Sequence, residues 1–359
     1  MSTSPRLSSL RKVIKSAKLD GMLVSSVHNV TYLSGFSGDD SLALVTMDAQ
    51  DIITDFRYVE QVEQECRGWG VVYLKKDLWS AVGAVVKKRR IKRLGFETAH
   101  LSHRGYAKLQ AAIGGVKLTA LENEIEKLRQ IKDAQEVEAI ETAIRTQETA
   151  FAEVRKWVRP GMTEKEVAGE LDCRMRRHGA EASAFETIAA AGPRGSLPHA
   201  RPTERVIRKR DALLVDWGAR RFLYNSDLTR VLHFGTVHRR FEKVYEIVRQ
   251  AQERGLAAIR PGATFSEVDG AARGFIRDQG YGEQFGHSLG HGVGLQIHER
   301  PTVRGDNQET LRPGMVFTVE PGIYIPGWGG VRIEDMVLVT DRGARVLSTC
   351  DKDLGRMTL

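Results

Sequence analysis

The segment Ala212–Arg230, ALLVDWGARRFLYNSDLTR, carries the strongest structural signal in this chain. An apolar run that begins at Ala212 ends in Asp216, and a second run carries Asp227. Gly218 and two arginines lie between the runs and are typical of a turn, so the segment predicts a β-hairpin. Acids on paired strands repel each other, and a metal ion between them is the usual remedy. For either aspartate taken alone, a solvated acid at a turn is the simpler interpretation.

Length and composition predict a soluble protein of two domains. The chain has 359 residues, which is long for one core, and its 41% hydrophobic and 28% charged residues are ordinary for a globular protein. It contains no apolar run of the roughly 18 residues that a membrane helix needs, and its N-terminus lacks the apolar core of a secretory signal. Cys66, Cys173 and Cys350 are far apart and form no pairing pattern, which indicates a reducing compartment. We therefore expect a cytoplasmic protein that has no membrane partner.

The net charge of +8 raises the question of a nucleic-acid partner. Basic clusters occur at residues 87–90, 205–210 and 239–240. They lack interleaved aromatic residues or a recognition motif. A solvated basic surface is therefore the favoured interpretation, and we expect no nucleic-acid partner.

Residues 1–121 predict a small α/β domain, because apolar strand-like runs alternate with helical segments. The predicted strands are Gly21–Val24, Ser41–Thr46, Ile52–Thr54, Val71–Leu74 and Arg93–Phe96, and the predicted helices are roughly 8–18, 58–66 and 78–88. Residues 28–38 are expected to be rich in turns. His28, His100 and His103 have no ligand partners at useful spacing, so we expect them to be structural or surface residues.

A second domain is predicted over residues 127–359, and it contains an internal repeat. A long amphipathic helix is expected from about residue 133 to residue 158. The next residues, RPGMTEKEVAG (159–169), share seven of eleven positions with RPGATFSEVDG (260–270). Thr163 and Glu166 predict a capping box that opens the following helix. Because the repeat occurs twice, we expect two similar α+β halves related by a pseudo-two-fold axis.

The repeat extends to residues that carry chemistry. Each half has a stretch that ends in a histidine, then an apolar strand that ends in an acid, then a second strand that carries an acid. In chain order these residues are His199, Asp216 and Asp227 in the first half, and His298, Glu320 and Glu334 in the second. Solvated surface acids would have no reason to recur in this way, so the metal interpretation is now favoured.

The segment HSLGHGVGLQIHE, His287–Glu299, completes the candidate site. It contains three histidines in twelve residues, interleaved with glycines that let a backbone approach a ligand closely. Buried structural histidines would explain one of the three well, and all three poorly.

The motifs DWGARRFLYNSDLTR, HSLGHGVGLQIHE, MVFTVEPGIY and GVRIEDMVLVT resemble those of the two-metal peptidases of the pita-bread fold, in the prolidase and Xaa-Pro aminopeptidase branch. LDGMLVSSVHNVTYLSGFSG and TDFRY resemble that branch's creatinase-like N-terminal domain. The resemblance implies an α+β pita-bread catalytic domain of two pseudo-symmetric halves, preceded by the smaller α/β domain. It also implies a homodimer.

The same resemblance implies roles for individual residues. The implied metal ligands are Asp216, Asp227, His291, Glu320 and Glu334. The implied catalytic residues are His298 as a donor to the oxyanion, His199 and His287 as lining of the substrate site, Arg332 as a residue that orients the carboxylates, and Glu320 as a proton shuttle. The motif around Ala191-Gly-Pro-Arg194 departs from the Ser-Gly-Pro-Asn that is frequent in relatives. Tyr324 and Trp328 can flank the pocket, but core packing is the favoured role for each.

The ligand types themselves constrain the cofactor. Four carboxylates and one imidazole make a hard, oxygen-rich site, which favours Mn²⁺, with Co²⁺ or Zn²⁺ as alternatives. Two ions about 3.5–4 Å apart lower the pKa of a water molecule that they share. We therefore expect two divalent ions and hydrolytic chemistry.

The expected activity is release of the residue that precedes proline, from dipeptides or short peptides with proline second. A dipeptidase needs a cation for the free carboxylate, and Arg304 or a residue of a partner subunit are candidates; the sequence does not choose between dipeptidase and aminopeptidase. Three other functions are alternatives for this sequence. The N-terminal domain argues against a methionine aminopeptidase, and the intact ligand set argues against both a creatinase-like hydrolase and a non-catalytic peptide-binding protein.

Overall fold

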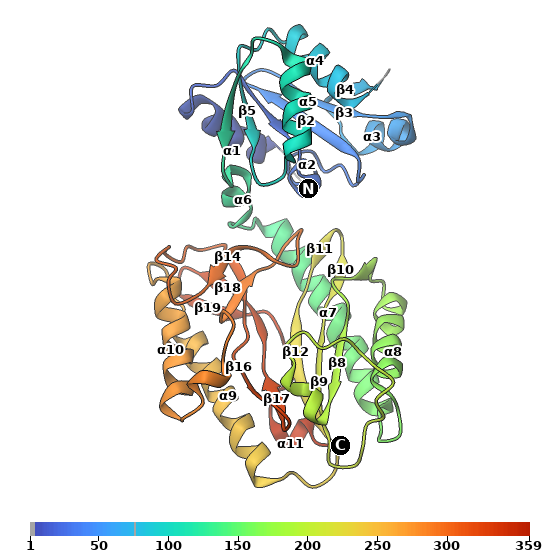
Figure 1. Ribbon diagram of the computed structural model, residues 1–359, viewed down its shortest axis with the longest axis vertical. Helices are drawn as coiled ribbons and strands as arrows, with labels where there is room; N and C mark the ends of the chain where they lie inside the picture. Colours follow the sequence, from blue (N-terminus) through green and yellow to red (C-terminus); the bar gives the residue numbers. More distant parts are fainter. Residues whose placement is uncertain (1–3, 75–76) are drawn as a thin grey trace. The chain divides into compact units, whose positions relative to one another are not determined.

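The computed structural model describes residues 4–74 and 77–359, and the chain divides into two compact units, Met1–Arg129 and Gln130–Leu359. Within the described residues, every helix is too short or too polar to cross a membrane. Figure 1 draws the elements in chain order by colour.

The first unit is built on a mixed six-stranded sheet in the order β4-β3-β2-β1-β5-β6. The strands are β1 (Gly21–Val24), β2 (Ser41–Thr46), β3 (Gln50–Thr54), β4 (Gly70–Tyr73), β5 (Arg93–Glu97) and β6 (Lys117–Leu121). The helices are α1 (Ser4–Ser16), α2 (Val27–Ser34), α3 (Val59–Glu65), α4 (Leu78–Lys88), α5 (His103–Ile113) and α6 (Glu124–Arg129), with a 3-10 turn at Phe56–Tyr58. The apolar faces of α4 and α5 pack on the sheet around Leu23, Leu44 and Leu94.

The predicted strands and helices of this unit are present, but the helices α2, α5 and α6 and the strand β6 were not predicted. Helix α2 lies where a turn-rich segment was expected, because Val30 and Leu33 are buried on one of its faces and Gly35 ends it with a φ of 80°. Ser102 caps the start of helix α5, where its hydroxyl accepts a hydrogen bond from the backbone N–H of Gly105. Tertiary burial therefore stabilises α2, and a local cap starts α5.

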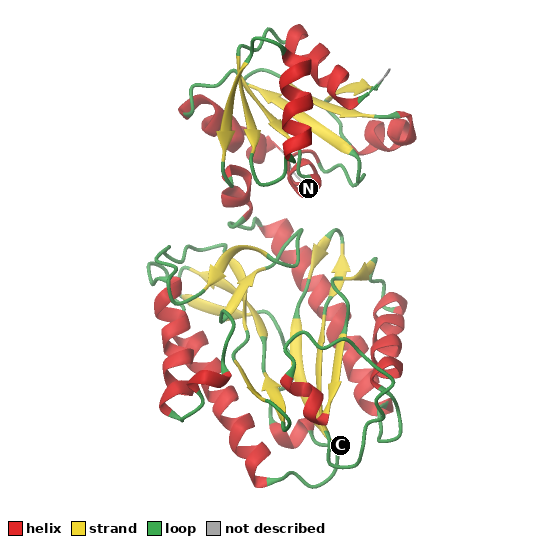
Figure 2. Ribbon diagram, in the orientation of Figure 1, coloured by secondary structure: helices red, strands yellow, loops and turns green. Residues whose placement is uncertain are grey.

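The second unit contains two halves, each with a pair of helices on its outer side and strands on its inner side (Figure 2). The first half has the helices α7 (Ala134–Trp157) and α8 (Glu164–Arg177), and the strands β7 (Ala182–Ser183), β8 (Ile188–Ala191), β9 (Ala212–Trp217), β10 (Ala219–Arg221), β11 (Tyr224–Asn225) and β12 (Leu228–His233). A 3-10 turn lies at Gly192–Ser196. Its main sheet has the order β12-β9-β8, and Phe151 of α7 stacks on Trp217, with 4.2 Å between ring centroids.

The second half follows the same plan. Its helices are α9 (Arg239–Ala258) and α10 (Phe265–Asp278), followed by a 3-10 turn at Gly282–Gln284, and a last short helix is α11 (Leu354–Met357). Its strands are β13 (Gly290–Gly292), β14 (Glu299–Val303), β15 (Val316–Val319), β16 (Gly322–Ile325), β17 (Gly329–Arg332), β18 (Asp335–Thr340) and β19 (Gly343–Val346). They form a sheet in the order β14-β13-β15-β18-β19 and the hairpin β16-β17.

Capping boxes open the corresponding helices of the two repeats. Thr163 and Glu166 exchange side-chain and backbone hydrogen bonds at the start of α8, and Thr264 and Glu267 do so at the start of α10. The predicted capping box is confirmed, and its copy at α10 shows that the sequence repeat is a structural repeat.

The hairpin predicted over Ala212–Arg230 forms between β9 and β12, with Asp216 opposite Thr229. Its tip differs from the prediction, because the two arginines belong to strand β10 rather than to the turn. The turn is made by Phe222 and Leu223, with φ of 49° and 68°. Positive φ at both central residues is the two-residue turn that fits the twist of a hairpin.

Candidate metal centre

The four acids that the repeat singles out lie at the ends of strands in the second unit and line one cavity of about 490 Å³. Asp216 is in β9, Asp227 immediately precedes β12, Glu320 follows β15, and Glu334 lies between β17 and β18. His291, in β13, lines the same cavity. The structure thus brings together five residues that span 334 − 216 = 118 positions.

Distances between members of this group are compatible with metal binding. One ligand atom each of Asp227, His291 and Glu334 lies within 4.8 Å of the others. The Nε2 atom of His291 is 3.5 Å from Oδ2 of Asp227 and 3.3 Å from Oε1 of Glu320. A single cation can therefore contact the imidazole and several carboxylates.

Glycine and threonine hold His291 against the neighbouring strand. Gly290 runs so close to β15 that a Cβ there would overlap the carbonyl oxygen of Thr318. The hydroxyl of Thr318 accepts a hydrogen bond from the backbone N–H of His291 (3.0 Å) and donates one to Oε1 of Glu320 (3.0 Å). This hydroxyl therefore fixes the imidazole-bearing backbone and the carboxylate relative to each other.

The electrostatics of the cluster call for positive charge. Burial, followed by repulsion from neighbouring carboxylates, raises the pKa of Asp227 and of Glu334 well above the usual range. Burial also raises the pKa of Glu320 to about 7, although Arg332 acts in the opposite direction. Such buried acids are costly in their charged form unless a cation compensates them.

Two unpaired carboxylate oxygens also indicate a bound cation. Oδ1 of Asp216 and Oε1 of Glu334 are buried and have no hydrogen-bond partner among the described residues. Buried polar atoms are rarely left unpaired, and oxygen donors of this kind are ligands for hard divalent cations. The donor set therefore fits a divalent metal.

Arg332 connects two of the acids, Asp216 directly and Glu334 through Thr229, by hydrogen bonds. Its Nη2 donates to Oδ2 of Asp216 (2.5 Å), and its Nε donates to the hydroxyl of Thr229 (2.9 Å). Thr229 in turn donates to Oε2 of Glu334 (2.7 Å). Sequence reasoning missed Thr229, although its position opposite Asp216 in the hairpin was the signal that could have found it.

Two histidines beside the acids are held in the neutral form. Burial, and then the nearby charge of Arg332, lowers the pKa of His287 to about 4. Burial, and then His291 and His199, lowers the pKa of His298 to about 4. At neutral pH each imidazole therefore offers one donor and one acceptor. His199 lines the cavity with them.

Tyr324 is buried, as the sequence predicts, and its hydroxyl also joins the polar network beside the acids. This hydroxyl contacts Nη1 of Arg332 (2.8 Å) and Nε2 of His287 (2.9 Å). Trp328 instead lines a second, smaller cavity together with His233 and Phe241, so it does not flank the metal cluster.

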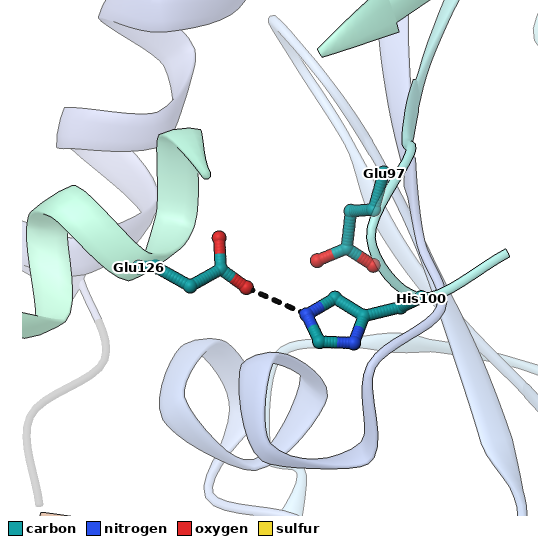
Figure 3. A group of neighbouring side chains, drawn as sticks. All are labelled: Glu97, His100 and Glu126. Atoms are coloured by element: carbon teal, nitrogen blue, oxygen red, sulfur yellow. Dashed lines mark hydrogen bonds and ion pairs between the residues drawn. The ribbon is translucent and has the colours of Figure 1, made fainter. Parts of the chain in front are cut away.

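A second cluster lies in the first unit, where no ligand partners were expected for His100. Nε2 of His100 is 2.8 Å from Oε1 of Glu126, and Glu97 lies beside them (Figure 3). The amide of Asn29 donates to both carboxylates, at 2.6 Å each, and Glu97 also accepts from the backbone N–H of Ser26. Although burial acts to raise it, the pKa of Glu126 is lowered by its hydrogen bonds to Asn29 and His100. These hydrogen bonds make the cluster a satisfied polar network that ties α6 to the sheet.

Comparison with known proteins identifies the family of each part of the chain. Residues 138–341 match the sequence profile of metallopeptidase family M24, and residues 6–131 match that of the creatinase/prolidase N-terminal domain. The chain belongs to metallopeptidase family M24. It is therefore an enzyme, a metallopeptidase whose pita-bread catalytic domain follows a creatinase-like domain.

Relatives of this M24 peptidase match nearly its whole length. The uncharacterized peptidase YqhT of Bacillus subtilis is 39% identical and covers 97% of this chain and 99% of its own length. An Xaa-Pro dipeptidase from Bacillus anthracis has a TM-score of 0.96, 38% identity and complete coverage of both chains. An X-Pro aminopeptidase from Thermotoga maritima has a TM-score of 0.89 and 38% identity, over 94% of this chain and 97% of that chain.

Proposed function

We propose that this M24 peptidase is a metal-dependent exopeptidase that hydrolyses the bond between an N-terminal residue and proline. The observation that carries this proposal is the convergence of four acids and His291 in one cavity that three further histidines also line. Solved relatives named as an Xaa-Pro dipeptidase and an X-Pro aminopeptidase, each 38% identical, support the choice of bond. Dipeptides and short peptides with proline second are the substrates.

The residues that would hold the metal are Asp216, Asp227, His291, Glu320 and Glu334, and the proposal is for two ions. Their oxygen-rich donor set favours Mn²⁺, with Co²⁺ or Zn²⁺ as alternatives. When bound, such ions supply Lewis acidity and make water a nucleophile at neutral pH.

The chain's own residues handle the protons and the developing charge. A water oxygen attacks the scissile carbonyl carbon, and the bond from that carbon to the proline nitrogen then breaks. Glu320 takes the proton from the water and passes it to the leaving nitrogen. A neutral His298 donates a hydrogen bond to the oxyanion. Arg332 keeps Asp216 in place throughout.

The walls of the cavity suit this substrate class. Phe185, Ile188, Pro198 and Ile297 line it together with the polar residues. An apolar wall with a few convergent polar groups is typical of a small-molecule site, and it can hold a proline ring and the side chain that precedes it. His199 and His287 complete the lining beside the scissile bond.

Cytoplasmic location and a homodimer belong to the same proposal. The three cysteines are free, as expected for a chain in a reducing compartment. Light scattering coupled to gel filtration tests the dimer, since a particle of 40.0 kDa, the mass of one chain, would contradict it.

A hydrolysis panel with added Mn²⁺ tests the activity. The substrates are Xaa-Pro dipeptides, longer Xaa-Pro peptides, Met-Ala peptides and creatine. Cleavage confined to the Xaa-Pro substrates is the expected result. Preferential cleavage of Met-Ala peptides would favour a methionine aminopeptidase, and turnover of creatine would favour a creatinase-like hydrolase.

A further inference from the structure

The cavity of the metal centre has a charged pair at its solvent end. Glu186 and Arg201 both line the cavity, and their side chains are 66% and 84% exposed. The Nε atom of Arg201 lies 3.4 Å from Oε2 of Glu186. Arg332, which lines the inner part, has a side chain only 4% exposed. The pair therefore marks the mouth through which a substrate enters.

Among the described residues that line this cavity, Arg201 is the cation that remains available to a substrate. Arg332 already donates to Asp216, Thr229 and Tyr324. Arg304, a sequence-based candidate for binding a substrate carboxylate, pairs with Asp306 and is not among the described residues that line the cavity. An exposed ion pair such as Arg201–Glu186 contributes little stability, so a competing carboxylate can replace Glu186.

The backbone that carries Arg201 is held firmly next to the reacting groups. Arg201 follows His199 by two residues, which limits their Cα separation to about 7 Å. Nη2 of Arg194 donates to the carbonyl oxygen of Arg201 (2.6 Å), and its Nε pairs with buried Glu164 (3.0 Å). Glu164 also accepts from the backbone N–H of Thr203 (3.0 Å). The start of the Arg201 side chain is thus fixed, while its guanidinium extends into the mouth.

Arg194 gives the motif Ala191-Gly-Pro-Arg194 a physical role. Its planar guanidinium reaches the Glu164 carboxylate and the Arg201 carbonyl at once. Arg194 is therefore a positioning residue for the segment that carries Arg201.

We infer that Arg201 binds the C-terminal carboxylate of an Xaa-Pro dipeptide in exchange for Glu186, so that this enzyme favours dipeptides over longer peptides. The inference rests on the proposed Xaa-Pro activity. In a dipeptide the proline carries a free carboxylate, which a guanidinium can bind through two parallel hydrogen bonds. In a longer peptide a neutral amide occupies that place, and it gains no charge-assisted hydrogen bond.

Three substrates distinguish carboxylate binding by Arg201 from a general effect on activity. They are an Xaa-Pro dipeptide, the same dipeptide with a C-terminal amide, and an Xaa-Pro-Xaa tripeptide. Arg201→Gln should raise KM for the free dipeptide about fivefold, the upper end of what an exposed ion pair contributes. Its kcat, and both parameters for the amide and the tripeptide, should stay within about twofold of the parent values. Arg304→Gln is the matched control. Arg304 is also an exposed arginine paired with a carboxylate, but it is not among the described residues that line the cavity.

Two further variants test the exchange with Glu186 and the support from Arg194. Glu186→Gln removes the competing carboxylate, so KM for the free dipeptide should fall while KM for the amide does not. Arg194→Lys keeps a charge near Glu164 but loses the fork, so it should raise KM for the free dipeptide alone, by less than Arg201→Gln does.

The inference is overturned if Arg201→Gln impairs all three substrates alike, or leaves the preference between dipeptide and amide unchanged. A rise in the dipeptide KM of Glu186→Gln also contradicts it. If the parent enzyme cleaves none of the three substrates, the proposed Xaa-Pro activity itself is wrong. If the parent cleaves them and the variants do not change the preference, only the role of Arg201 is wrong.

Discussion

The imidazoles of His291 and His298 meet edge to face, with 4.2 Å between ring centroids and 71° between ring planes. Their surroundings nevertheless differ. His291 faces the carboxylates of Asp227 and Glu320, whereas no carboxylate of the described residues lies within ion-pair range of His298. This difference supports the proposal that His291 is a metal ligand and that His298 donates to the substrate.

Substitution of the two histidines should separate catalysis from metal binding. His298→Ala should keep the fold and its bound metal while kcat falls by roughly 10²–10³, the usual loss when one oxyanion donor is removed. His291→Ala should lose metal as well as activity. Elemental analysis and kcat on both variants make the comparison. Loss of metal from His298→Ala, or turnover at the parent rate, would show that the roles are assigned wrongly.

Metal affinity should depend on pH. Burial raises the pKa of Glu320 to about 7, and burial with mutual repulsion raises the pKa values of Asp227 and Glu334. A metal binds the deprotonated carboxylates, so binding must release protons and should weaken as the pH falls from 8 to 6. Calorimetric titration with Mn²⁺ in buffers of different ionisation enthalpy measures both effects. An affinity that does not change over this range would contradict the prediction.

Chelation should abolish peptidase activity, and added Mn²⁺ should restore it. The reason is the oxygen-rich donor set, which leaves two buried carboxylate oxygens without other partners among the described residues. Activity is measured after exhaustive chelation and again after stepwise addition of Mn²⁺, Co²⁺ or Zn²⁺. Full activity in a sample that elemental analysis shows to be metal-free would rule out the proposed mechanism.

A buried ion pair next to the metal centre should dominate the stability of the catalytic unit. Asp335 accepts from Arg230 (2.7 Å), Gln252 (2.7 Å) and Lys352 (2.8 Å), and the side chains of Asp335 and Arg230 are almost fully buried. Asp335→Asn leaves the Arg230 charge uncompensated, so the free energy of unfolding should drop by about 3–5 kcal/mol.

Asp306→Asn is the control for this stability prediction, since it breaks an exposed ion pair with Arg304. Its free energy of unfolding should change by less than about 0.5 kcal/mol. Urea unfolding of both variants in the presence of a chelator removes any contribution from metal. If both variants lost the same free energy of unfolding, burial would not make the Arg230–Asp335 pair more stabilising than an exposed pair.

The sequence by itself was sufficient for the repeat, the class of fold and the group of residues that meets in the cavity. Asp216 and Glu320 end apolar strands of the two repeats, and an acid in that place has no solvated alternative once the strand is buried. The glycines around His291 can also be interpreted from the sequence alone, because only glycine allows β13 to approach β15 so closely. Such features depend on neighbours in the chain, which a sequence displays directly.

Only the tertiary structure decided which distant side chains touch. Helix α2 forms because burial outweighs the turn signals around Gly35. His100 meets Glu126, Tyr324 links Arg332 to His287, and Arg201 faces Glu186. Each of these contacts depends on the reach of side chains from separate elements and on how those elements pack. Charge and size can be read from a sequence, but the distances of a few ångströms on which hydrogen bonds and ion pairs depend exist only in the folded chain.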